Sequence, residues 1–167
     1  MVVDGDRFEG WYLTVHPRLI AALTVVAGDV TVASEVVDEA FARAYERWGR
    51  VGGMASPDGW TYRTALNVLR RRQRRLRLEH QLHLRRLTPG PAVAPPGDWS
   101  IEVWDALRHL PPRERTAVAL RYVADLPTDD IAAAMRIAPG TVGATLHSAR
   151  RRLSTALAEP LEEVTDA

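Results

Sequence analysis

Apolar residues recur at helical spacing through most of this 167-residue chain, in blocks that are separated by Gly, Pro and Asp. Three short blocks fall within residues 110–153, and each is bounded by residues that end or begin a helix. Thr128 is expected to cap the second block, and Pro139 is expected to begin the third. Because a helix of about two turns is unstable alone, the three blocks must pack together. The residues expected on their inner faces are Ala117, Leu120, Ala124, Ile131, Ala132, Met135, Val142, Leu146, Ala149 and Leu153.

The short turn at residues 136–138 and the basic end of the last block, Arg150–Arg152, are typical of a DNA-binding helix-turn-helix. An ordinary three-helix core with a solvated Arg run is the alternative. If the motif binds DNA, its last helix presents one outward face to the groove. That face is expected to contain Thr141, Ala144, His147, Ser148 and Arg151.

The first half of the chain begins with a helix or helix pair over residues 4–26, which is expected to end at Gly28 and Asp29. Thr31 or Ser34 can cap the helix that follows. Its apolar stripe contains Val36, Val37, Ala40, Phe41, Ala44, Tyr45 and Trp48.

The other face of this second helix is charged, with Glu35, Asp38 and Glu39 toward its beginning and Arg43 and Arg47 toward its end. This order matches the helix dipole, so an ordinary solvated face explains it as well as a binding surface does.

A glycine-rich loop is expected over Gly49–Gly59, and helical spacing resumes at Trp60. The new helix then carries a dense basic block. Single-sign charge of this density repels itself unless an anionic partner binds, and nucleic-acid phosphate fits a forked guanidinium best. A membrane-surface or calmodulin-like role would need an apolar face that the block lacks. The block contains Arg70, Arg71, Arg72, Arg74, Arg75 and Arg77.

Composition excludes several classes of function. The chain has no Cys, which rules out disulfides and thiolate metal sites, and its five His show no metal-ligand spacing. It has no Lys for a phosphate-binding loop and no Ser, His and Asp constellation, so no enzyme activity, cofactor or metal is expected. No apolar run approaches the roughly 20 residues of a membrane span, so we expect a cytoplasmic protein without membrane insertion. The net charge of +1 hides the local basic block.

Helical spacing is lost after Leu87, where four Pro residues indicate an extended linker. A helix is expected to restart at Ser100, with Ile101, Trp104 and Leu107 facing inward. The predicted fold is therefore all-α, with two small helical domains at residues 4–87 and 100–158 joined by a Pro-rich linker at 88–99.

Two segments of the second half resemble a known family. IAAAMRIAPGTVGATLHSARRRL is similar to the second and third helices of region four of bacterial sigma factors. LPPRER followed by ALRYVADL is similar to the preceding helix in the extracytoplasmic-function (ECF) subfamily. The resemblance implies a helix-turn-helix (winged-helix-like four-helix) domain whose last helix enters the major groove of the minus-thirty-five promoter element.

The first half resembles region two of the same family. SEVVDEAFARAYERW is similar to the segment that grips the RNA polymerase coiled coil, and WTYRTALNVLRRR is similar to the promoter-melting helix. The polymerase-binding residues that the resemblance implies are Glu35, Asp38 and Glu39. The DNA-binding residues implied for this half, together with those of the Arg block, are Trp60, Tyr62, Arg63, Asn67, Arg70, Arg71, Arg74 and Arg75.

The last helix departs from the family pattern at Gly143–Thr145, where members usually carry Lys or Arg, and at Ser148, where they carry Arg. Fewer cations mean fewer phosphate and guanine contacts, so weak binding of the upstream element is expected.

The resemblance implies a sigma-E-like factor that binds core RNA polymerase and promoter DNA, directs transcription initiation, and has an anti-sigma factor as a further partner. Two alternatives stay open on the sequence alone. One is a two-module DNA-binding regulator that never joins polymerase, and the other is a protein that binds polymerase or an anti-sigma factor without supporting initiation.

Overall fold

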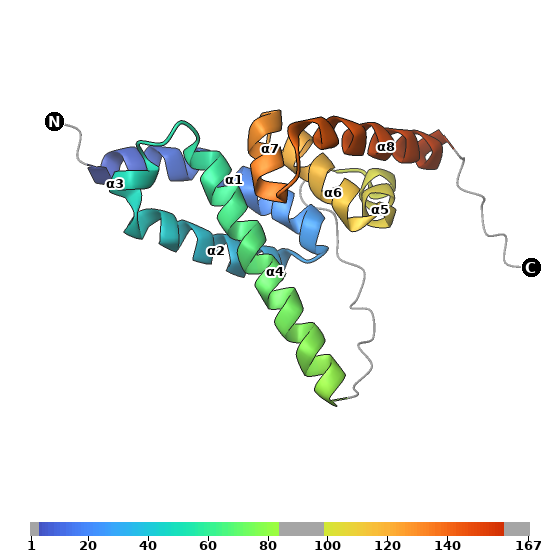
Figure 1. Ribbon diagram of the computed structural model, residues 1–167, viewed down its shortest axis with the longest axis horizontal. Helices are drawn as coiled ribbons and strands as arrows, with labels where there is room; N and C mark the ends of the chain where they lie inside the picture. The colour runs from blue at the N-terminus through green and yellow to red at the C-terminus, as the bar shows by residue number, and fades with distance from the viewer. Residues whose placement is uncertain (1–3, 84–98, 159–167) are drawn as a thin grey trace, which may run out of the picture.

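A computed structural model describes residues 4–83 and 99–158, and within these ranges the chain is helical and contains no strand (Figure 1). This confirms the predicted all-α fold. The helices of the first half are α1 (Asp4–Ala27), α2 (Val30–Glu46), α3 (Trp48–Val51) and α4 (Pro57–His83). Those of the second half are α5 (Ile101–His109), α6 (Pro112–Val118), a π-helical turn η1 (Ala119–Val123), α7 (Thr128–Met135) and α8 (Pro139–Ala158).

The junction of α1 and α2 is set by Gly28 and Asp29. Gly28 adopts the left-handed region, with φ of 73°, which a glycine tolerates without a steric penalty. The Asp29 carboxylate then accepts hydrogen bonds from the backbone N–H groups of Thr31 at 2.7 Å and Val32 at 3.0 Å. Asp29 is therefore the cap of α2, and the prediction of Thr31 or Ser34 was wrong because α2 begins earlier, at Val30.

The expected loop at residues 49–59 is shorter in the structure, because α3 occupies its beginning and α4 begins at Pro57. Ser56 determines this early start, since its Oγ accepts a hydrogen bond from the Gly59 N–H at 3.0 Å. Pro57 suits the first helical position because it has no N–H to satisfy.

The helices of the second half begin and end close to the predicted residues, with local differences. Ser100 caps α5 by accepting from the Val103 N–H at 3.2 Å. Ile101, expected to be buried, is 73% exposed, and Tyr45 of α2 is likewise exposed. Thr128 is the first residue of α7 and makes no capping bond, so that prediction was also wrong. Arg136 ends α7 in the left-handed region, with φ of 59°.

The two halves pack against each other around one continuous hydrophobic core. Helix α1 contacts α6 and η1, and α4 contacts α7 (Figure 1). The C-terminal part of α4 extends away from this body (Figure 1). The linker predicted at residues 88–99 lies outside the described residues except for Trp99, so its structure and the domain boundaries stay predictions. Large buried residues of the shared core are Leu19, Leu23 and Leu66 from the first half and Leu120, Ile131 and Val142 from the second.

Candidate nucleic-acid and protein interfaces

The acidic face predicted on α2 is present and exposed. Glu35, Asp38 and Glu39 are all exposed, while Val36 and Val37 on the other side of the helix are buried. Because α2 begins at Val30, none of these carboxylates lies in its first turn. The helix dipole acts mainly within that turn, so it does not account for their position.

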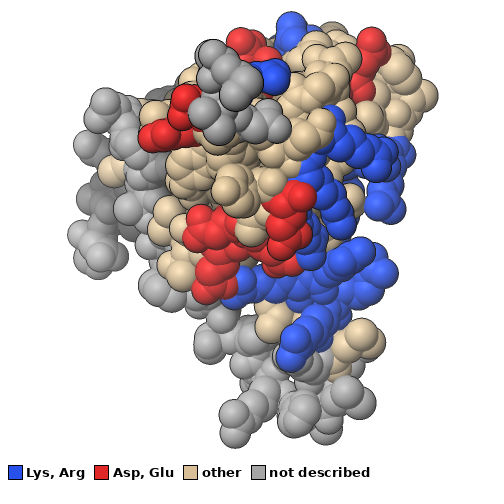
Figure 2. All heavy atoms as spheres, turned by 90° about the vertical axis from the view of Figure 1, so that its left-hand side faces the viewer, with Lys and Arg blue, Asp and Glu red and all other residues tan. Residues whose placement is uncertain are grey.

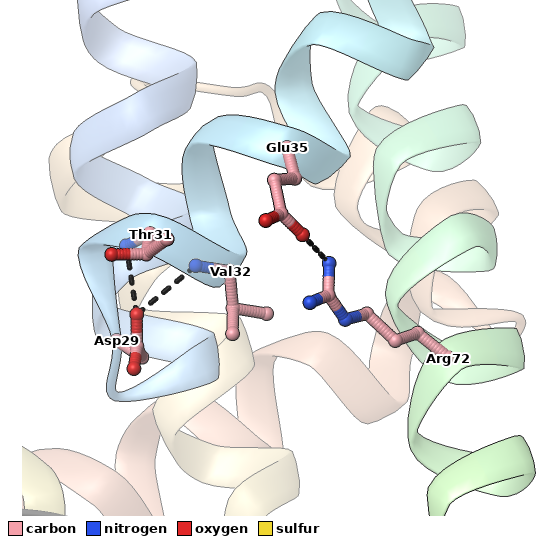
Figure 3. A network of polar contacts seen from close by, with 5 residues as sticks. All are labelled: Asp29, Thr31, Val32, Glu35 and Arg72. Atoms are coloured by element: carbon pink, nitrogen blue, oxygen red, sulfur yellow. Dashed lines mark hydrogen bonds and ion pairs between the residues drawn. The ribbon is translucent and has the colours of Figure 1, made fainter.

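Each of these carboxylates has a different basic partner. Glu35 pairs with Arg72 of α4, which lies beside α2 (Figure 3). Glu39 pairs with Arg43 one turn further along α2. Asp38 lies 3.9 Å from the Nε2 atom of His16 on α1, and its side chain is 68% exposed.

The Arg block occupies the part of α4 that follows its buried section. Arg71, Arg74 and Arg75 are exposed, whereas Arg72 is half-buried. A groove between α2 and α4 is lined by Glu35 and Glu39 on one side and by Arg71, Arg72 and Arg75 on the other. Figure 2 shows the consequence on one face of the molecule, where an acidic patch borders a longer run of Arg side chains.

The residues predicted to contact unpaired promoter bases are divided between surface and core. Arg63 is exposed, and Trp60 and Asn67 are half-buried. Tyr62 is only 1% exposed, and its burial raises the pKa of the phenol. The prediction that Tyr62 binds DNA is therefore inconsistent with this structure.

Tyr62 is buried because of its position on α4. Tyr62 shares one helical stripe with Ala65, Leu66 and Leu69, all of which are buried. Within the described chain its hydroxyl has no hydrogen-bond partner.

Side chains at the start of α4 and along its middle are bonded to α7. The Ser56 hydroxyl donates to Asp130 Oδ2 at 2.5 Å, and Arg136 donates to Asn67 Oδ1 at 3.1 Å. Arg70 donates to the Ala134 carbonyl at 3.3 Å. Partial burial and the nearby Arg136 lower the pKa of Arg70.

Two predicted DNA contacts, Asn67 and Arg70, are thus engaged with the helix-turn-helix half of the chain. The sequence pattern did not indicate this interface. Ser56 and Asp130 are 74 residues apart, and each has a sufficient local explanation as a turn residue or a first-turn acid.

The outward face of α8 largely agrees with the prediction. Ala144, His147 and Arg151 are exposed, and Thr141 is half-buried. Ser148 is half-buried because its hydroxyl donates to Glu114 Oε1 of α6 at 2.8 Å.

Thr145 does not belong to this outward face. It is 9% exposed, and its hydroxyl donates to the Thr141 carbonyl at 2.7 Å. The weakly charged surface expected at residues 143–145 therefore consists of Gly143 and Ala144 alone.

The described residues contain no group of three or more His, Cys, Asp or Glu side chains that could hold a metal ion. Within the same ranges, no helix combines the length and apolarity that crossing a bilayer requires.

Several known proteins are similar to this chain. Residues 100–153 match the family model described as Sigma-70, region 4. The RNA polymerase sigma-E factor of Streptomyces antibioticus is 30% identical over 150 residues, which cover 88% of this chain and 82% of that protein. The sigma-E factor of Streptomyces coelicolor is 29% identical over the same length, covering 88% and 84%.

A solved structure shares the fold. It is the sigma factor RpoE in complex with the anti-sigma factor NepR from Bartonella quintana, with a TM-score of 0.79 and 22% identity. The match covers 90% of this chain and 96% of that one.

The ECF sigma factor SigL of Mycobacterium tuberculosis is 28% identical and matches 80% of this chain. Together with the helix-turn-helix at residues 100–153 and the sigma-E relatives, these matches show that the chain belongs to the ECF family of RNA polymerase sigma factors.

Proposed function

We propose that this sigma factor docks on core RNA polymerase through Glu35, Asp38 and Glu39 of α2 and contacts promoter DNA through α4 and α8. Its role is to direct transcription initiation by binding, with no covalent step of its own. The observation that carries the docking surface is the exposure of three carboxylates in the body of a helix, where neither capping nor the dipole requires them.

The acidic face fits a cationic partner surface. Two of its carboxylates already bind guanidinium groups within the chain, Glu35 with Arg72 and Glu39 with Arg43. An Arg-rich helix of a partner would offer the same pairing of guanidinium with carboxylate across an interface. This agrees with the polymerase contact that the family resemblance implies.

The Arg block is proposed to bind promoter phosphate. Arg71, Arg74 and Arg75 are exposed on α4, where a nucleic-acid backbone can reach them. Trp60 and Arg63, earlier on the same helix, are proposed to contact unpaired bases and their phosphates. Tyr62 is not part of this proposal, because it is buried.

The upstream element is proposed to contact α8 through Thr141, Ala144, His147 and Arg151. These residues share one face of the helix that follows the turn, as recognition helices present their contacts. Ser148 contributes less than the sequence suggests, since its hydroxyl is bonded to Glu114.

DNA binding by Asn67 and Arg70 requires a change of arrangement. Asn67 and Arg70 bond to α7 in the state described here, so they become available to DNA when α7 separates from α4. We include an anti-sigma factor among the proposed partners, because the Bartonella quintana sigma factor that shares this fold was solved with one. The proposed function belongs in the cytoplasm, the location expected from the sequence.

The test is a pull-down of core RNA polymerase with the double variant Asp38→Arg and Glu39→Arg. We expect core affinity to fall at least about tenfold, since like charges then face the cationic partner. Asp6→Arg with Glu9→Arg is the matched control, because it makes the same charge change at exposed positions of α1.

Unchanged core binding by the α2 variant would refute the docking surface. If wild-type protein binds promoter DNA but no core, the regulator alternative is correct instead. If it binds core and the complex does not initiate, the non-initiating interaction protein is correct.

A further inference from the structure

The ion pair between Glu35 and Arg72 joins the two surfaces that the proposed function assigns to different partners. Glu35 belongs to the acidic face of α2, and Arg72 lies within the Arg block of α4 (Figure 3). The two residues are 37 positions apart in sequence and meet where α2 packs on α4.

This pair is accessible to both partners. The Glu35 side chain is 54% exposed and the Arg72 side chain is 38% exposed. They lie in the groove whose other charged residues are Glu39, Arg71 and Arg75. An ion pair of such exposure is weak, and opening it shifts an equilibrium by up to about fivefold.

The other carboxylates of the acidic face do not make this connection. Glu39 pairs with Arg43 on its own helix, and Asp38 lies near His16 of α1. Among the three proposed polymerase contacts, Glu35 is the one whose ion pair joins the acidic face to Arg72 of the Arg block.

We propose that the Glu35–Arg72 pair couples polymerase binding to DNA binding. A cationic group of polymerase that binds Glu35 releases Arg72 for a DNA phosphate. A phosphate that binds Arg72 likewise releases Glu35 for polymerase. Because linkage is reciprocal, each partner strengthens the binding of the other by the same factor. This inference rests on the proposed function, since it takes Glu35 to be a polymerase contact.

Removing Arg72 is expected to raise an affinity where loss of a binding residue would ordinarily lower one. Arg72→Gln removes a cation that is not itself a proposed polymerase contact, yet it should raise the affinity for core polymerase about two- to fivefold in the absence of DNA. Arg74→Gln is the matched control, because it removes an equal charge from an exposed position of the same block outside the groove. The gain for Arg72→Gln must exceed that of the control.

The reciprocal experiment measures how tightly the full chain, without polymerase, binds a fluorescein-labelled single-stranded oligonucleotide. Glu35→Gln should raise this affinity about two- to fivefold over Asp38→Asn, which removes the same charge from a carboxylate whose basic partner is His16 of α1. Adding core polymerase should strengthen oligonucleotide binding by the wild type more than by either variant of the pair.

The inference is overturned if Arg72→Gln binds core no better than Arg74→Gln, or if Glu35→Gln binds the oligonucleotide no better than Asp38→Asn. Failure of the proposed function has a separate signature, which is unchanged core binding after reversal of Asp38 and Glu39. All variants alter exposed or half-exposed side chains, so thermal melts that match the wild type confirm that the fold is intact.

Discussion

Gly59 of α4 lies close to Asp130 of α7, and it offers a test of the packing between the two halves. A Cβ atom on Gly59 would lie 2.6 Å from Asp130 Cγ, 2.7 Å from Asp130 Oδ1 and 2.8 Å from Ser56 Oγ. These are the side chains that form the 2.5 Å hydrogen bond between the halves. Gly59→Ala must therefore displace Asp130 and break this bond.

The expected magnitude combines two opposing effects. Loss of a hydrogen bond to a charged group costs about 1.5–3 kcal/mol. Replacing a helical Gly by Ala stabilises the helix by up to about 1 kcal/mol. We therefore expect Gly59→Ala to lower the free energy of unfolding by about 0.5–2 kcal/mol, measured by urea denaturation.

Two controls separate the clash from other causes. Gly53→Ala should have little effect, because its Cβ would make only an ordinary contact at 3.7 Å with the Arg50 carbonyl. In an Asp130→Ala background the clash with Asp130 is absent, and only Ser56 Oγ, which caps the start of α4, stays close to the new Cβ atom. There the substitution should cost less stability than it does in the wild type. An equal loss of stability in both backgrounds would refute the proposed contact between Gly59 and α7.

Three further predictions concern the Arg block, the buried Tyr62 and the outward face of α8. Replacing Arg71, Arg74 and Arg75 by Gln should reduce the slope of log DNA affinity against log salt by about one unit per lost phosphate contact; an unaltered slope would assign the block to protein contacts. Tyr62→Phe should leave the free energy of unfolding unchanged or raise it by about 1 kcal/mol, because the buried hydroxyl has no described partner; a clear loss would reveal a bond to it. Ala144→Arg should strengthen binding to a guanine-containing upstream element by about 1–3 kcal/mol in a fluorescence-anisotropy titration, whereas weakened binding would make the small side chain part of the readout.

The sequence predicted the helices and most of their buried stripes, because helical periodicity is a local property. It was less successful for caps. Asp29 caps α2 in place of the expected Thr31 or Ser34, since several neighbouring residues could fill the role and only the start of the helix selects one. Local pattern alone does not fix where a helix starts.

The candidate DNA contacts were harder to predict, for a different reason. Tyr62 and Thr145 match positions that suggest DNA contact, yet both are buried. The helical spacing of Tyr62 with Leu66 and Leu69 indicates a core position. The resemblance to the promoter-melting helix favours DNA contact instead, and the prediction for Tyr62 rests on that resemblance. The pairing of Ser56 with Asp130 had no comparable signal, since it depends on how two distant helices pack.

The exposed position of the α2 carboxylates was predicted correctly, and the structure places them outside the first turn, where the helix dipole does not explain them. The ion pair of Glu35 with Arg72 could not be predicted, because it requires the contact between α2 and α4.

The central claim is that α2 docks on core polymerase so that this chain can direct initiation. The most direct measurement is a run-off transcription assay with purified core polymerase and a promoter selected by the wild-type holoenzyme. It compares the wild type with the variant carrying Asp38→Arg and Glu39→Arg. The account predicts a transcript from the wild type and at least about a tenfold lower yield from the variant at limiting sigma concentration, with recovery when the variant is added in excess. Equal yields from the two proteins at every concentration would contradict it.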